Sequence, residues 1–160
     1  MGLDYSYIVV AKKSDKESLV SYIANNIDLE STDFGVGATI EFKIDEVIDE
    51  YLQEVVNEFQ KAEHSPETNS LITTGTAKIG YIYFDIKEPV GSEFIFASFT
   101  AATTNMSLLF SNSTSIQTWF INFSKSVNAI AVFQDLEDQE YKLIHNEGID
   151  LDIIVDYLKP

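Results

Sequence analysis

The sequence predicts a single α+β domain spanning 1–160, in which three helices and a short C-terminal helix pack on a sheet of five to seven strands. Three observations predict this class. The chain has 160 residues, an ordinary single-domain length, and 45% of them are hydrophobic. Segments with a two-residue apolar period stand beside segments of helical period. Their order, β-α-β-α, then β-β-β, then α-β-β-α, favours a mainly antiparallel or mixed sheet.

The N-terminal quarter predicts one strand and one helix. Residues 5–11 are aromatic or β-branched, which is typical of a strand buried on both faces. Ser14 and Glu17 then have the spacing of a capping box. Apolar residues recur on one helical face as far as Ile27, so a helix is expected there.

The next segment predicts a turn, a strand and a second helix. Glycines mark a turn at 35–37, and residues 38–44 alternate between apolar and polar, as in a strand with one solvated face. Helical spacing returns from about Glu46 to Ala62, before the polar loop 64–76.

Three strands are expected in the centre of the chain. Residues 80–86 alternate, and 94–99 are apolar on both faces, as in a central strand. The short apolar run 106–110 predicts a further strand.

The C-terminal third predicts a third helix, a hairpin and a last helix. Thr114 and Gln117 have capping-box spacing, and the helix after them is expected to pack its aromatic face on Phe96 or Phe99. Strands are expected at 129–134 and 141–145, and a short helix after Asp150. The aromatic face consists of Trp119, Phe120 and Phe123.

The charge composition narrows the classes of function. Twenty-six acidic residues face ten basic ones, all lysine, which gives a net charge of −16. Without arginine and cysteine there is neither a bidentate phosphate clamp nor a thiolate site. An acidic surface repels nucleic acid and anionic membranes and attracts basic proteins. The competing interpretation is that the negative charge serves mainly to keep the protein in solution.

No segment has the roughly 18 apolar residues of a membrane-spanning helix. The N-terminus also lacks a basic region followed by an apolar run, so we expect a cytoplasmic protein.

No compact catalytic motif is present. The chain lacks a phosphate-binding glycine loop, a nucleophile elbow and a zinc-binding helix motif, so no catalytic residue is assigned. His64 and His145 stand far apart in the sequence, and we therefore expect no metal site and no cofactor. The acidic residues between Asp135 and Glu140 are interpreted as a solvated hairpin turn rather than a calcium site.

Four glutamates form the most unusual charge pattern. Glu46, Glu50, Glu54 and Glu58 stand at successive i+4 positions of the second expected helix, with no lysine between them. Like charges at this spacing destabilise a helix by about 0.2–0.5 kcal/mol per pair. The row is interpreted either as a docking face for a basic partner or as a merely solvated face.

A weaker candidate is a ligand site built from the N-terminal strand and the hydroxyl-rich stretch that begins at residue 100. Hydroxyl groups bind ligands, but they also satisfy backbone groups in loops. The candidate residues are Asp4, Tyr5, Tyr7, Thr100, Thr103 and Thr104.

The segments GLDYSY at 2–7 and SFTAATT at 98–104, followed by MSLLF at 106–110, resemble a family of small uncharacterised bacterial proteins. The resemblance implies a bacterial, cytosolic, single-domain protein. It implies no activity, because none is assigned to that family.

These observations favour a non-catalytic α+β domain that binds another protein through an acidic surface. In size and charge the chain is similar to immunity proteins, which block basic toxin enzymes. The alternative is a small-molecule or metal-dependent enzyme that uses carboxylates near the N-terminal strand and the 100–107 loop.

Overall fold

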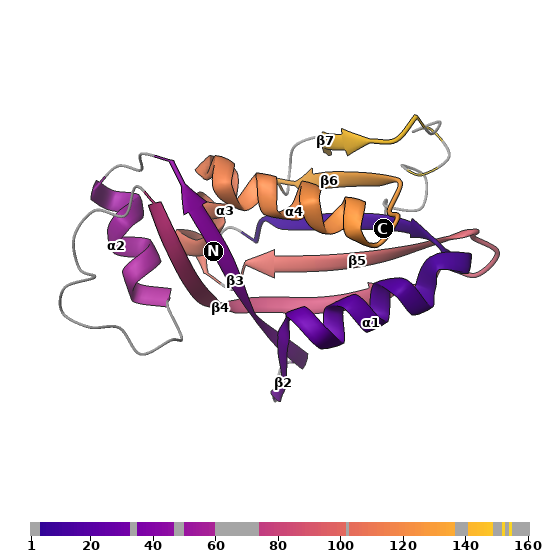
Figure 1. Ribbon diagram of the computed structural model, residues 1–160, viewed down its shortest axis with the longest axis horizontal. Helices are drawn as coiled ribbons and strands as arrows, with labels where there is room; N and C mark the ends of the chain where they lie inside the picture. Colours follow the sequence, from indigo (N-terminus) through magenta and orange to yellow (C-terminus); the bar gives the residue numbers. More distant parts are fainter. Residues whose placement is uncertain are drawn as a thin grey trace.

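A computed structural model describes residues 4–32, 35–46, 50–59, 74–101, 103–136 and 141–148, together with Asp152 and Ile154. Seven strands in these ranges form one sheet in the order β2-β3-β4-β5-β1-β6-β7, and every neighbouring pair is antiparallel. Four α-helices with described bounds accompany the sheet, and Figure 1 shows how they lie on it. The predicted α+β class is confirmed.

The described elements have the following bounds, in chain order. The strands are β1 (Ser6–Lys12), β2 (Asp28–Thr32), β3 (Gly35–Asp45), β4 (Thr74–Lys87), β5 (Phe94–Ala101), β6 (Ala131–Asp135) and β7 (Lys142–Asn146). The helices are α1 (Lys16–Asn26), α2 (Glu50–Phe59), α3 (Thr104–Asn112) and α4 (Thr114–Ser126), with a short 3-10 turn, η1 (Lys13–Asp15).

The main core lies between the helices and one face of the sheet. Aromatic rings form the centre of this core. Phe120 of α4 stacks on Tyr7 of β1, with ring centroids 4.2 Å apart. Phe99 of β5 lies 5.3 Å from Phe120 and 5.8 Å from Phe123. The predicted packing of this helix on Phe99 is confirmed. Trp119 is only partly buried and stacks on Phe123 at the margin of the core.

A second, smaller apolar cluster lies on the opposite face of the sheet. Since side chains alternate along a strand, Ile8 and Val10 of β1 point away from the helices, as does Phe96 of β5. Ile154 packs on this cluster and is fully buried. Part of this face is therefore apolar and buried as well.

The predicted strand at 106–110 is wrong, because these residues belong to α3. Thr103 caps this helix, and its hydroxyl accepts a hydrogen bond from the Met106 amide at 3.1 Å. Ser113 ends α3 and also caps α4, since its hydroxyl accepts from the Ile116 amide at 3.2 Å. Two short helices thus meet at Ser113, and the predicted cap at Thr114 is wrong by one residue.

Two further expectations for the first half are wrong. The 3-10 turn η1 precedes α1, whose N-cap is Asp15 without a side-chain hydrogen bond, so Ser14 forms no capping box. Residues 35–37 are the start of β3, paired with β2, rather than a turn. Gly35 accommodates a φ of +125°, a conformation that side chains rarely allow.

The second expected helix is described only in part. Residue 46 lies in a bend, and the described part of α2 starts at Glu50. Most of the expected polar loop, 64–73, and most of the expected C-terminal helix lie outside the described residues. Asp152 and Ile154 are helical, as expected.

Candidate functional site

The outer surface of α2 carries the exposed part of the glutamate row. Glu50 and Glu54 are both exposed one helical turn apart, and neither forms an ion pair with a described residue. Tyr51 lies beside them with 49% of its surface exposed. We call these three residues the α2 face. The side chain of Glu58 lies outside the described part of the structure.

The tyrosine of the α2 face has a fixed orientation. Its hydroxyl donates a hydrogen bond to the Asn105 Oδ1 atom of α3, at 2.6 Å. The opposite side of α2 buries Val55 and Val56, so the helix is held against the body of the molecule. Sequence reasoning missed Tyr51, because no local motif marks an exposed tyrosine whose partner lies in a distant helix.

Glu46 does not belong to the α2 face. Its carboxylate reaches the N-terminus of α4, where it accepts from the Ser113 hydroxyl at 2.8 Å and from the Ser115 amide at 2.6 Å. A third, longer bond comes from the Thr114 amide at 3.3 Å. The free amides at the start of a helix favour a negative charge, so Glu46 acts as a clamp between β3 and α4.

The pKa of Glu46 reflects two opposing effects. Partial burial disfavours the charged form and by itself raises the pKa. Hydrogen bonds from the hydroxyls and amides of Ser115, Ser113 and Thr114 outweigh this, so the pKa lies below its usual value of 4.5. The carboxylate is therefore charged at neutral pH and committed to an internal contact.

The weaker ligand candidates are brought together, but most of them serve internal contacts. The Tyr5 amide donates to the Ser107 hydroxyl at 3.0 Å, so the residue before β1 is bonded to α3. Tyr7 is buried and donates to the Phe110 carbonyl at 2.9 Å, while burial, followed by the charge of Glu46, raises its pKa. Thr103 is the cap of α3.

The three remaining candidates lie at different depths. Asp4 and Thr104 are exposed, at the start of β1 and of α3. Thr100 is half-buried on β5, and its hydroxyl lies 2.8 Å from that of Ser6 on β1. Thr100 also lines a cavity.

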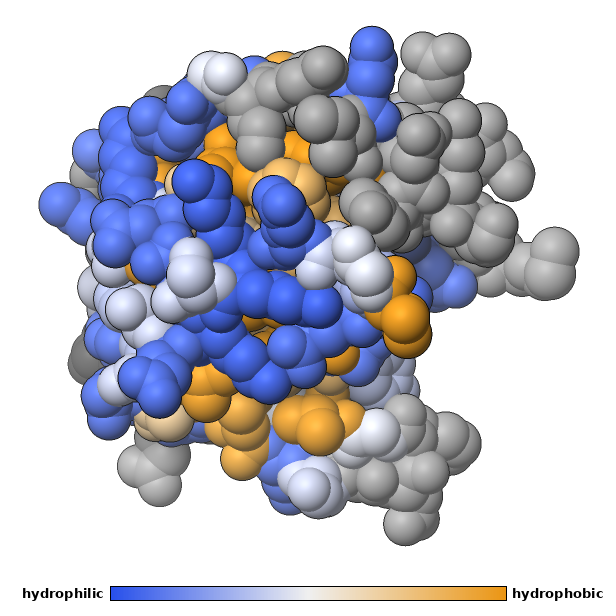
Figure 2. All heavy atoms as spheres, turned by 90° about the vertical axis from the view of Figure 1, so that its right-hand side faces the viewer, coloured by the Kyte–Doolittle hydropathy of each residue, from blue (hydrophilic) through white to orange (hydrophobic). Residues whose placement is uncertain are grey.

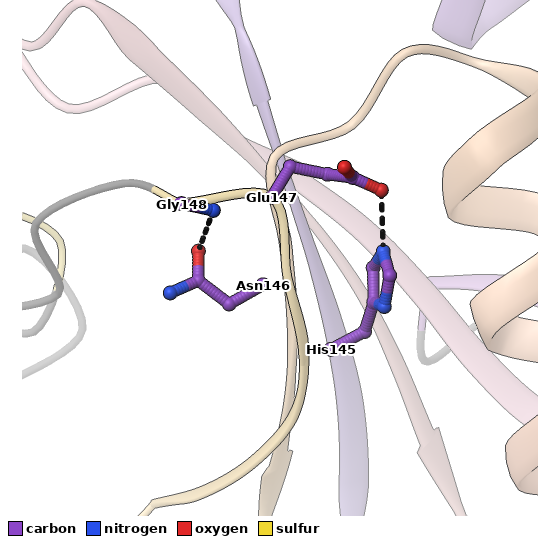
Figure 3. A network of polar contacts seen from close by, with 4 residues as sticks. All are labelled: His145, Asn146, Glu147 and Gly148. Carbon is purple, nitrogen blue, oxygen red and sulfur yellow. Dashed lines mark hydrogen bonds and ion pairs between the residues drawn. The ribbon is translucent and has the colours of Figure 1, made fainter.

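His145 and Glu147 contact each other at the end of β7. The His145 Nε2 atom lies 2.7 Å from the Glu147 Oε1 atom, and the Asn146 side chain accepts from the Gly148 amide at 3.1 Å (Figure 3). Within the described ranges, no group of three or more histidine and acidic side chains is placed to hold a metal ion. His64 lies outside the described residues.

A groove of about 300 Å³ lies beside the Glu46 clamp. Trp119 forms one wall, with Lys43 and Asp45 of β3 and hydroxyls of α4 around it. Because Glu46 already occupies the Thr114 and Ser115 amides, the helix N-terminus in this groove is closed to an external anion.

The end of the molecule opposite α2 carries three of the lysines. The start of α1 and the β4–β5 turn lie at the end opposite α2 (Figure 1). That end is mostly hydrophilic, with small separate apolar patches (Figure 2). Lys12, Lys13 and Lys16 lie there, and Lys16 pairs with Glu88 at 2.9 Å. Glu50 and Glu54 of α2, by contrast, form no ion pair with a described residue.

Comparisons with protein-family models, curated proteins and solved structures gave no match. The resemblance of the two sequence segments to a bacterial family stays a prediction. No helix in the described part of the chain is long and apolar enough to cross a membrane.

Proposed function

We propose that this chain is a non-catalytic binding domain that docks a basic protein through the α2 face. The observation that carries the proposal is the composition of this face. Two exposed carboxylates stand one turn apart beside an exposed tyrosine, and α2 contains no lysine. A net charge of −16 adds long-range attraction for a cationic partner.

The electrostatic repulsion between Glu50 and Glu54 in the free protein supports a role of the α2 face in binding. Glu50 and Glu54 repel each other by about 0.2–0.5 kcal/mol, and no described cation offsets this repulsion. A basic partner supplies the missing positive charge, and such complementarity accelerates the encounter of two proteins. An immunity-protein-like role, in which the partner is a basic enzyme, fits this surface.

Tyr51 provides the second element of the proposed interface. Tyrosine is enriched among the residues that contribute most to protein–protein binding. Its hydrogen bond to Asn105 restrains the ring before the partner arrives. Less side-chain entropy is therefore lost on binding, which favours affinity.

The first experiment identifies the partner. A photoreactive benzoylphenylalanine replaces Tyr51, and crosslinked proteins in an extract of the source cells are identified by mass spectrometry. The same replacement at Tyr83 is the control, because its exposed fraction of 40% is close to the 49% of Tyr51. We expect a basic protein to crosslink from position 51 only. Equal crosslinking from both positions contradicts the proposal.

The second experiment tests the charges of the α2 face with that partner. The variant Glu50→Gln/Glu54→Gln should associate about tenfold more slowly at low salt, and the difference should vanish near 1 M salt, where the screening length is about 3 Å. The variant Glu30→Gln/Glu41→Gln removes two exposed charges from β2 and β3 and is the matched control. If both variants slow association equally, net charge rather than the α2 face steers the encounter.

A further inference from the structure

The sheet face that points away from the helices is divided into a polar and an apolar half. Strand register aligns its side chains in rows across β4, β5, β1 and β6. The polar row is Tyr83, Thr100, Ser6 and Asp135, and the middle row is Asp85, Ser98, Ile8 and Phe133. The third row, apolar except for its first member, is Lys87, Phe96, Val10 and Ala131. Polarity therefore changes within two steps along the central strands.

A cavity of about 210 Å³ lies where the two halves meet. Ile8 and Phe96 give it an apolar floor, and Phe96 also belongs to the cluster that Ile154 covers. The cavity is smaller than the roughly 300–1,000 Å³ of sites for drug-sized ligands. It has room for one small molecule with a compact apolar body.

Three hydroxyl groups from adjacent strands line the polar side of the cavity: Ser6, Ser98 and Thr100. Ser6 is buried, and its hydroxyl lies 2.8 Å from that of Thr100. One hydroxyl of this pair donates to the other, so lone pairs remain to accept from a ligand. The two oxygen atoms are held in place by the pairing of β1 with β5.

The charged groups around the cavity favour a cation. Two carboxylates line the cavity, Asp85 of β4 and Asp135 of β6. Among the described lining residues they face one lysine, Lys87, which is exposed. Tyr141 also lines the cavity, and burial, followed by the charge of Asp135, raises the pKa of its phenol. The negative charge of Asp135 thus acts on the cavity itself.

We propose that this cavity binds a small primary amine with an apolar or aromatic body. The ammonium group donates to the Asp135 carboxylate and to the Ser6–Thr100 hydroxyl pair, while the body lies on Ile8 and Phe96. None of the described lining residues belongs to α2, so this site and the proposed docking face are independent.

The test titrates the full chain with phenethylamine and monitors the backbone amide chemical shifts by NMR. 2-Phenylethanol and phenylacetate, which carry the same ring without the positive charge, are the ligand controls. We expect phenethylamine to shift the amide signals of Ser6, Ser98 and Thr100, with an affinity at least tenfold above that of the alcohol. No shift at 10 mM amine, or equal affinity for amine and alcohol, would overturn the proposal.

Three variants separate a specific site from general attraction to an acidic surface. Asp135→Asn should weaken phenethylamine binding at least tenfold, and Ser98→Leu should abolish it by filling the cavity without changing the charge. Asp28→Asn, which removes an exposed charge from β2, should leave binding unchanged. If Asp28→Asn weakens binding as much as Asp135→Asn does, or if a folded Ser98→Leu variant still binds, the cavity is not the site.

Discussion

At the scale of single residues, Glu46 shows how a charged side chain acquires a structural role. Replacing it with glutamine keeps the size of the side chain but removes the charge that the α4 N-terminus stabilises. We expect Glu46→Gln to lower the free energy of unfolding by about 1–2 kcal/mol at pH 7. We expect a value near the lower end of this range of unfolding free energies, because the Glu46 carboxylate is partly exposed. Urea denaturation at pH 7 measures the difference.

The same variant has a defined pH dependence. The pKa of Glu46 is lower in the folded than in the unfolded chain, so its contribution is fully present above the unfolded value of about 4.5. As the pH falls through the lower, folded value, the contribution is lost, and the two proteins should become equally stable. Glu41→Gln, at an exposed position on β3, is the control. A constant difference down to pH 2 would contradict the assignment.

The carbonyl of Phe110 provides a second residue-scale prediction. This carbonyl at the end of α3 accepts from the Tyr7 hydroxyl and from the Gln134 side-chain amide, both at 2.9 Å. Tyr7→Phe or Gln134→Met alone should cost about 1 kcal/mol, since one donor remains. The double variant should cost more than the sum, because a buried acceptor loses both partners. Chemical denaturation of all four proteins gives the coupling energy, and strict additivity would show that another donor replaces them.

At the scale of elements, α4 contributes Trp119, Phe120 and Phe123 to the aromatic core, and these residues are not equivalent. Phe120 is fully buried between Tyr7, Phe99 and Phe110, whereas Trp119 keeps a partly exposed edge. Phe120→Ala should therefore cost about 3–5 kcal/mol. Trp119→Ala should cost less, although it removes a larger side chain. The reverse order in urea denaturation would contradict the observed packing.

The helices and strands with a clear period could be predicted, whereas α3 could not. A run as short as 106–110 is apolar enough for a buried strand or for a helix, and periodicity alone does not distinguish them. Its deciding signals are the caps Thr103 and Ser113, which flank the run at a helix length. The edge strand β2 was not predicted from the sequence, because Asp28–Thr32 is largely polar. This strand gains its structure from pairing with β3.

The candidate sites depend still more on tertiary structure. The spacing of Glu46 from Glu50 predicts one continuous row, but a bend at residue 46 turns its carboxylate toward α4. The cavity on the sheet face that points away from the helices combines residues of β4, β5, β1 and β6. Only strand register places Ser6 beside both Thr100 and Asp135. Sequence spacing contains no information on that register between distant strands.

At the scale of the whole molecule, charge opposes compactness. The net charge of −16 is spread over an exterior with few compensating contacts, since the described residues contain one lysine–carboxylate ion pair, Lys16–Glu88. Repulsion between like charges destabilises the compact state more than the expanded one. Mobile ions screen these interactions, and the screening length falls from about 30 Å at 0.01 M to about 8 Å at 0.15 M salt.

The protein should therefore become more stable as salt is added at low concentration. Between 0.01 and 0.2 M sodium chloride we expect the melting temperature to rise by about 2–4 °C for each kcal/mol of repulsion that is screened. Thermal unfolding monitored by circular dichroism measures the melting temperature at each salt concentration. The control variant has glutamine in place of five exposed glutamates, Glu17, Glu30, Glu41, Glu50 and Glu54. Its melting temperature should be higher at low salt and rise less. If both proteins respond equally to salt, the stabilisation comes from a general effect of the salt on hydration rather than from relief of surface repulsion.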